Sequence, residues 1–199
     1  WVETNTRMLR YSARLADMRS MESQRQNPLL EEIIHEYSWN YLAFTVDTQG
    51  QNIGRSDGKA PKSYADRVYV QQVLQGQHLG KQVLIGKTSG KPALVLAVPV
   101  YQQNNELVGG LAIAMTIGDI SERIANAQIG STGFAFLVDE SGKVIAHPSE
   151  EMANTRQDLA SHPAILAAKA GKSLTQYQDE GREVIAHIEL AQVLRELTL

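Results

Sequence analysis

The order of one short helix and three strands between Tyr64 and Ile117 constrains the fold of this chain more than any other feature. The helix is expected from about Tyr64 to Leu74 and ends at Gly76, because glycine commonly terminates helices. Three strands are expected after it, near residues 80–87, 92–102 and 107–117. Strands that follow one another through short turns pair antiparallel. The segment therefore predicts a small antiparallel sheet with a helix and a polar loop over one face, which forms a pocket rather than a catalytic centre.

Helices dominate the residues before this segment. An apolar stripe is formed by Met8, Tyr11, Leu15 and Met18. Its spacing of three and four residues predicts one long helix over residues 1–26. A second helix is expected to begin at Asn27-Pro28, since Asn caps helices and Pro is favoured at their first position. Two strands are then expected at 41–47 and 51–57, on either side of a turn that contains Gly50.

The same order of elements begins again after residue 130. The expected elements are a strand at 133–139, a strand at 144–147, a helix at 161–170 and a hairpin over 173–190. We therefore expect an α+β protein with a long N-terminal helix followed by two similar modules with antiparallel sheets. The expected boundaries are 1–38 for a helical stalk, 39–130 for the first module and 131–199 for the second. Because residues 191–199 have a helical pattern, the second module is expected to lack a final strand and to be incomplete.

Composition excludes several classes of function. The net charge of −3 offers no basic surface for nucleic acid. The absence of cysteine excludes disulfides and thiol catalysis, and the five histidines lack the spacing of a metal motif. No nucleophile or phosphate-binding motif is present, so we expect neither an enzyme nor a cofactor.

Membrane segments are also absent from the sequence, because no apolar run approaches the roughly 18 residues that span a bilayer. The chain begins at Trp1 within a helical pattern and ends at Leu199 without a finished element. We interpret it as part of a longer protein, whose membrane segments would lie outside this sequence.

Candidate ligand-binding residues gather around the start of the expected helix. Arg67 can bind a carboxylate through two hydrogen bonds, or it can pair with Asp57 or Asp66. The hydroxyl groups of Tyr64 and Tyr69 can bind a ligand, or their rings can pack in the core. The candidate set is Ser56, Asp57, Tyr64, Arg67, Tyr69, Lys87, Ser89 and Met115.

The remaining candidates lie on two loops and on the last strand of the first module. Ser56 and Asp57 lie at the end of the strand 51–57 and face the mouth of the pocket, while Lys87 and Ser89 offer donors to an anion. Met115 is a candidate for an apolar wall of the pocket, although a core position is the favoured interpretation of this residue.

Four segments resemble a known family of sensor domains. They are Asp66-Arg67-Val68-Tyr69, Gly86-Lys87-Thr88-Ser89-Gly90-Lys91-Pro92, Ala97-Val98-Pro99-Val100 and the region around Leu137-Val138-Asp139-Glu140. Together with the order of elements, they resemble the double Cache (dCache) domains of bacterial methyl-accepting chemotaxis receptors, sensor histidine kinases and diguanylate cyclases. The resemblance implies two PAS-like modules in the periplasm and a small-molecule ligand in the membrane-distal module. It also implies membrane anchors outside this sequence.

The motif of the amino-acid sensors in that family is only partly present. Arg67 and Tyr69 stand where those sensors have Arg and Trp, but Val70 replaces the following Tyr. Leu84-Ile85-Gly86 occupies the position of their Tyr-x-Asp, and Leu111 that of their last Asp. A buried ligand ammonium without these carboxylates would cost several kcal/mol. The departure predicts an anionic or neutral ligand, such as a carboxylate or a planar heterocycle.

Dicarboxylate-sensing kinases are a second comparison. They share the Arg-x-Tyr helix start and the Thr-Ser-Gly loop, but they carry a basic residue where this chain has Ala114 and Met115.

The resemblance leads to a function and to alternatives. We expect the periplasmic ligand-binding domain of a transmembrane chemoreceptor, which signals across the membrane. The alternatives are a domain with a vestigial pocket that docks a periplasmic binding protein, and the sensor of a histidine kinase or diguanylate cyclase. The stripe on residues 1–26 is narrow and flanked by polar side chains, so we also expect a weak homodimer through the long helix.

Overall fold

The computed structural model describes residues 2–118, 122, 124, 126–179 and 181–189. The chain divides into two compact units, residues 1–116 and 117–199, called here the first and the second unit. The helix expected over residues 191–199 lies outside the described residues.

Three helices open the first unit: α1 (Val2–Ser12), α2 (Ala16–Arg19) and α3 (Ser23–Glu36). The prediction of one long helix over residues 1–26 is therefore wrong. The backbone is extended at Leu15, with φ −64° and ψ 141°, and left-handed at Met21, with φ 52°. Neither conformation continues a right-handed helix, so the chain turns at both places.

The apolar stripe on these helices does not form one continuous seam. Met18 is fully buried in the core, whereas 71% of Tyr11 is exposed. The expected start of the second helix at Asn27 is also displaced, because α3 begins after Glu22. The Asn27 side chain accepts a hydrogen bond from the backbone N–H of Arg55 at 2.9 Å, so it connects α3 to a strand instead of capping the helix.

A five-stranded antiparallel sheet forms the centre of the first unit. Its strands are β1 (Asn40–Val46), β2 (Asn52–Arg55), β3 (Gly80–Ile85), β4 (Pro92–Tyr101) and β5 (Leu107–Thr116). They lie in the order β2-β1-β5-β4-β3, so the last strand in sequence is the central one. The strands and their antiparallel pairing confirm the antiparallel sheet expected from the sequence for this part of the chain.

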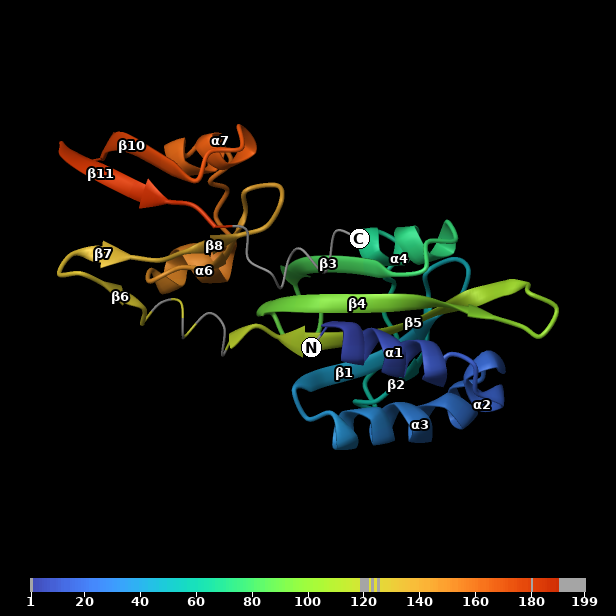
Figure 1. Ribbon diagram of the computed structural model, residues 1–199. Helices are drawn as coiled ribbons and strands as arrows, with labels where there is room; N and C mark the ends of the chain where they lie inside the picture. The colour runs from blue at the N-terminus through green and yellow to red at the C-terminus, as the bar shows by residue number, and fades with distance from the viewer. Residues whose placement is uncertain (1, 119–121, 123, 125, 180, 190–199) are drawn as a thin grey trace. The chain divides into compact units, whose positions relative to one another are not determined.

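The two faces of the sheet are covered by different helices (Figure 1). The helix α4 (Val68–Leu74) packs on β3, β4 and β5, whereas α1 packs on β4 and β5, and α3 on β1 and β2. The side chains that pack with α4 include Leu42, Phe44, Val95 and Ala114. Because successive residues of a strand point to opposite faces, Leu96, Ile113 and Met115 point toward α1 and α3, and all three are fully buried.

The described residues of the second unit include three two-stranded antiparallel sheets and the helices α6 (Glu150–Thr155) and α7 (Pro163–Lys169). The strands are β6 (Gln128–Ile129), β7 (Gly133–Phe134), β8 (Leu137–Val138), β9 (Val144–Ala146), β10 (Leu174–Asp179) and β11 (Arg182–His187). The helix and the hairpin expected over 161–190 are confirmed, whereas the expected strand at 133–139 is interrupted between β7 and β8, and α6 was not expected.

The same turn occurs in both units. Asp47 Oδ1 accepts hydrogen bonds from the backbone N–H groups of Gln49 and Gln51, at 2.8 and 2.9 Å. In the second unit, Asp139 Oδ1 accepts from the N–H groups of Ser141 and Lys143, at 2.9 and 3.0 Å. A side chain that bonds its own backbone in this way stabilises a tight turn.

Each of these turns contains a glycine that no other residue can replace without strain. Gly50 has φ 74° and Gly142 has φ 93°, in the left-handed region. A Cβ atom would lie 2.7 Å from Ala65 Cα at the first position and 2.7 Å from Ala160 Cα at the second. In both units the turn therefore packs against the segment that leads into the next helix.

Candidate functional site

The candidate site lies where the segment before α4 and the loop between β3 and β4 meet the end of β2. Its central residue is Arg55, which ends β2 and is only 3% exposed. Arg55 Nε and Nη2 donate to the two carboxylate oxygens of Asp57, at 2.7 and 2.8 Å. Its Nη1 donates to the Tyr64 hydroxyl at 3.0 Å, and Nη2 also donates to Thr88 Oγ1 at 3.1 Å. One guanidinium therefore connects three segments of the chain.

The Arg55–Asp57 pair has the electrostatics of a buried ion pair. The hydrogen bond from Arg55 lowers the pKa of Asp57, and the same bond raises the pKa of Arg55. Bidentate pairs of this kind are among the strongest side-chain interactions in proteins. Arg55 was not among the expected site residues, because its local sequence, Gly54-Arg55-Ser56-Asp57-Gly58, has the composition of a turn.

A second ion pair joins the two loops. Lys87 Nζ lies 2.5 Å from Asp66 Oδ1, donates to the carbonyl oxygen of Ser63 at 2.8 Å, and lies 5.7 Å from the centre of the Tyr64 ring. In the opposite direction, Lys62 Nζ donates to the carbonyl oxygen of Lys87 at 2.7 Å. The hydrogen bond from Lys87 lowers the pKa of Asp66. The charges of Lys87 and Asp66 therefore neutralise each other.

Tyr41 and Ser89 form another contact beneath the loop. The Ser89 hydroxyl donates to the Tyr41 hydroxyl at 3.3 Å. Tyr41 lies where the pairing of β1 with β5 shifts register, between Asn40 and Leu42, so both Tyr41 and Leu42 reach the face that α4 covers. A Cβ atom at Gly86 would lie 2.5 Å from the Tyr41 hydroxyl oxygen, which explains why glycine occupies this position.

The aromatic side chains fill the space between α4 and the sheet. Tyr64 and Tyr69 are 3% and 2% exposed. The Phe44 ring centre lies 4.5 Å from that of Tyr64 and 6.4 Å from that of Tyr69. Burial raises the pKa of Tyr69 and of Tyr41, and the positive charge of Arg67 opposes both increases. Arg67 is therefore close enough to both rings to act on them electrostatically.

Arg67 has a hydrogen-bond donor that is not used. It precedes α4 with an extended backbone, and 20% of its side chain is exposed. Its Nε atom is buried and has no hydrogen-bond partner among the described residues, since the nearest carboxylate oxygen, Asp66 Oδ2, is 3.8 Å away. Of the two alternative partners expected for Arg67, Asp57 is excluded because it binds Arg55, whereas Asp66 forms a long ion pair with Arg67 without a hydrogen bond.

Two candidate residues, Met115 and Ser56, contact the core or the backbone and do not line the space beneath α4. Met115 does not line the space beneath α4, because it follows Ala114 on β5 and so points to the opposite face; its candidate role as a pocket wall is corrected. Ser56 exchanges hydrogen bonds with Ala43, since its backbone N–H donates to the Ala43 carbonyl at 2.9 Å and its Oγ accepts from the Ala43 N–H at 3.0 Å.

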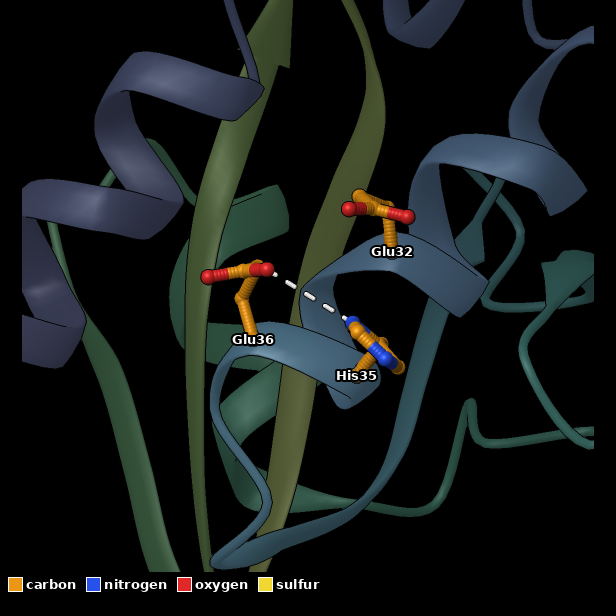
Figure 2. A group of neighbouring side chains, drawn as sticks. All are labelled: Glu32, His35 and Glu36. Atoms are coloured by element: carbon orange, nitrogen blue, oxygen red, sulfur yellow. Dashed lines mark ion pairs between the residues drawn. The ribbon is translucent and has the colours of Figure 1, made fainter.

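A group of possible metal ligands lies elsewhere, at the end of α3. Glu32, His35 and Glu36 place one ligand atom each within 4.8 Å of one another, and Figure 2 shows them on successive turns of this helix. All three are exposed, and His35 Nδ1 lies 3.5 Å from Glu36 Oε1. Exposed acidic residues at helical spacing are common without a metal, so we assign no metal site here.

The fold is that of bacterial chemoreceptor ligand-binding domains. The ligand-binding domain of the Pseudomonas fluorescens chemoreceptor CtaA, in complex with L-leucine, superposes with a TM-score of 0.69 at 15% identity over 94% of this chain and 78% of that chain. The ligand-binding domain of Mlp24 with asparagine gives a TM-score of 0.77 at 14% identity, over 92% of this chain and 76% of that chain.

The sequence identifies the family. A model of the Cache domain, of the dCache type, matches residues 2–190, so the chain belongs to the dCache family. The methyl-accepting chemotaxis protein McpA of Bacillus subtilis is 28% identical over 110 residues, which are 54% of this chain and 16% of McpA. The methyl-accepting chemotaxis protein PscA of Pseudomonas syringae is 28% identical over 120 residues, 58% of this chain and 19% of PscA. The chain thus spans less than a fifth of these relatives. Among its described helices, none is both long and apolar enough to cross a bilayer.

Proposed function

We propose that the first unit binds a small organic molecule beneath α4 and that Arg67 is its anchor. The observation that carries this proposal is the buried Nε of Arg67, which has no partner among the described residues. The neighbouring cations are already neutralised, Arg55 by Asp57 and Lys87 by Asp66. A ligand that supplies a carboxylate or another planar acceptor would satisfy the unused donor with charge-assisted hydrogen bonds.

The same balance of charge argues against a cationic ligand. The two ion pairs sum to zero, so Arg67, together with Lys62 on the Lys87 carbonyl, leaves the site with an excess of positive charge. CtaA and Mlp24 bind amino acids, whose ammonium group needs an acceptor. Here Asp57 and Asp66 are engaged by Arg55 and Lys87, so an ammonium would have to displace one of these cations. An anionic or neutral ligand is therefore favoured over an ordinary amino acid or a polyamine.

Ligand access would require the two loops to move. Tyr64 and Tyr69 are almost fully buried, and the cross-links from Arg55 and Lys87 hold the loops over them. A ligand that binds only the open arrangement would shift the population toward it. A difference in affinity of a few kcal/mol between the two arrangements is enough for such a shift. The ligand signal would thus begin as a displacement of α4 and the loops.

In the wider protein, we propose that this chain is the extracytoplasmic, non-catalytic sensor of a transmembrane chemoreceptor. The dCache match and the methyl-accepting relatives support this role. We further propose that the two units are PAS-like modules, the first membrane-distal and the second membrane-proximal, in a periplasmic domain anchored by segments outside this sequence. The repeated turns at Asp47 and Asp139 support the two-module interpretation.

We also propose a weak homodimer through α1. Its support is Tyr11, a large side chain that is 71% exposed on this helix. Sedimentation at high protein concentration should show a dimer that Tyr11→Glu weakens; a strict monomer would contradict the proposal.

A thermal-shift screen of carboxylates, neutral heterocycles, amino acids and polyamines tests the ligand proposal. The expected result is a rise in melting temperature with an anionic or neutral compound. The rise should be absent in Arg67→Ala and retained in Arg7→Ala, a control that removes an exposed arginine side chain from α1. Stabilisation by a polyamine alone would contradict it. If no metabolite acts but a loaded periplasmic binding protein forms a complex with the chain, the site is vestigial and the docking alternative is correct.

A further inference from the structure

A separate groove lies in the first unit between α1–α2 and the end of β4. Its volume is about 670 Å³. Arg10 on α1, Arg14 after α1 and Arg19 at the end of α2 contribute to one side, while His78, Tyr101 and Gln102 contribute to the other. None of these residues belongs to the site beneath α4 described above.

The architecture of the sheet explains why this groove is open. The strand β3 begins at Gly80, opposite Ala97, whereas β4 continues to Tyr101. The last residues of β4 therefore have no strand beside them on that edge within the described sheet. Pro99 in this stretch discourages the addition of another strand. Gln102 Nε2 donates to the Arg19 carbonyl at 2.9 Å, which fixes α2 against this wall.

The groove is strongly positive. Three arginines and one histidine line it, and no aspartate or glutamate is among its described lining residues. The acidic residues of α1 and α2 are used elsewhere, since Glu3 pairs with Arg7 and Asp17 with Arg25. Across the part of the chain that the structure describes, Arg10, Arg14 and Arg19 form no ion pair.

The Arg19 side chain is a second indication that the groove accepts an anion. Its Nε atom is buried and has no hydrogen-bond partner among the described residues. A buried charged donor without an acceptor costs free energy, and an anion in the groove would remove that cost. Arg10 and Arg14 are exposed, so they can adjust to a ligand without changing the core.

We propose that this groove binds a small multivalent anion, of the polycarboxylate or polyphosphate class. Guanidinium groups bind such oxyanions through paired hydrogen bonds. The volume lies within the range of small-molecule sites, about 300–1,000 Å³, and exceeds what a monatomic ion needs. The site would act in addition to the one beneath α4, and the proposal does not depend on that site.

Calorimetric titration with citrate and with pyrophosphate, at constant ionic strength, tests this proposal on the whole 199-residue chain. The test variant is Arg10→Gln/Arg14→Gln, which removes two exposed cations from the groove. The matched control is Arg7→Gln, which removes an exposed arginine from the same helix but outside the groove. Arg67→Ala is a second control, because it alters only the site beneath α4. Thermal unfolding confirms that each variant is folded.

The expected result is saturable binding of at least one probe, weakened about tenfold or more in Arg10→Gln/Arg14→Gln and unchanged in both controls. Arg19→Gln should also weaken binding. The absence of saturable binding by either probe, or an equal loss in Arg7→Gln, would overturn the proposal. Loss of binding only in Arg67→Ala would assign the anion to the α4 site and would overturn it as well. A complex with an acidic protein but with neither probe would identify a docking surface instead.

Discussion

Asp47 and Asp139 open the same turn in the two units, and the residues that follow differ in a way that affects ligand chemistry. Arg55 comes eight residues after Asp47, whereas His147 comes eight residues after Asp139. Arg67 precedes α4 with an extended backbone, and His162 precedes α7 in the same way. The first unit therefore has guanidinium groups where the second has imidazoles.

The imidazoles of the second unit belong to an aromatic cluster. The Phe136 ring centre lies 5.9 Å from that of His147 and 5.5 Å from that of His162, and Tyr177 lies 5.2 Å from His162. Nδ1 of His147 accepts from the Ser149 N–H at 2.9 Å, and Nδ1 of His162 accepts from the Ala164 N–H at 3.2 Å. Both rings are thus fixed in orientation by a hydrogen bond from their own backbone. The comparison indicates that the same local backbone arrangement can carry an arginine, which is always charged, or a histidine packed among aromatic rings.

The largest expected effect is a difference in ligand affinity between substitution of Arg67 and substitution of His162, its counterpart in the second unit. Arg67→Ala should weaken binding of the best screened anionic ligand by about 2–5 kcal/mol, because the buried ligand charge would lose its partner. His162→Ala should leave the affinity for the same ligand unchanged. Calorimetry of the three proteins measures both effects. Equal losses in the two variants would contradict the assignment of the site to the first unit.

Arg55 should matter more for stability than for a direct ligand contact. Arg55→Ala should lower the free energy of unfolding by about 3 kcal/mol, since it leaves Asp57, Tyr64 and Thr88 without their shared donor. In the second unit, Arg156 forms a partly buried pair with Asp139, and Arg156→Ala should also destabilise. Chemical denaturation measures these losses, with Arg7→Ala as the exposed control expected to cost about 0.5 kcal/mol or less. A loss for Arg55→Ala no larger than that of the control would show that the cluster contributes no stability.

The shared turn can be tested with glycine substitutions in both units. Gly50→Ala and Gly142→Ala should each destabilise by about 2 kcal/mol, because the new Cβ meets both a left-handed backbone and the neighbouring alanine. Gly58→Ala is the matched control, since Gly58 also has a positive φ, 61°, but nothing lies within 4 Å of the added atom. It should cost about 1 kcal/mol. If Gly50→Ala lowers the stability of the protein but Gly142→Ala does not, the two turns are not equivalent.

The smallest expected effect is a difference in acid sensitivity. Burial, followed by the charge of His162, lowers the pKa of His147 below its ordinary value of 6.5. The unfolded state then binds more protons, so the second unit should lose stability as the pH falls below 6.5 and through the folded pKa. The hydrogen bond from Arg55 lowers the pKa of Asp57 below 3.8, so its contribution is present above 3.8 and is lost as the pH falls through the folded value.

Hydrogen exchange resolved by peptide can follow the two units separately between neutral and acidic pH. Protection in residues 133–189 should decrease at a higher pH than protection in residues 40–116. His147→Phe should remove the earlier decrease, because phenylalanine keeps the ring but does not titrate. A first unit that loses protection before the second would contradict the difference between the two sites.

Much of the candidate site was predictable from local patterns. Arg67, the phenols of Tyr64 and Tyr69, and the loop with Lys87 and Ser89 were predicted together, and the structure gathers them over one face of the sheet. The helix itself was expected from about Tyr64, but α4 begins at Val68. Their ligand role remains a proposal. The signal was local, because a helix start and a polar loop between strands can be recognised within a few residues.

Arg55 and Tyr41 were missed for different reasons. Arg55 is flanked by Gly54, Asp57 and Gly58, so its sequence resembles an exposed turn, and only the packing of distant loops buries it. An arginine two residues before an aspartate at the end of a strand was the available signal. Tyr41 reaches the site only through the register shift in β1, which depends on its pairing with β5 some seventy residues later.

The sequence by itself determined the order of α4 and the strands of the first unit, their antiparallel sheet, the glycine turns and the dCache family, because periodicity, turn residues and short motifs are local properties. The tertiary structure alone decided that the expected long helix is divided, that Met115 points away from α4, and that Arg55 and Lys87 are neutralised while Arg67 keeps an unused donor. These outcomes depend on strand register and on which distant loops meet. The free energies of such long-range pairings are set by burial and geometry, which no local pattern contains.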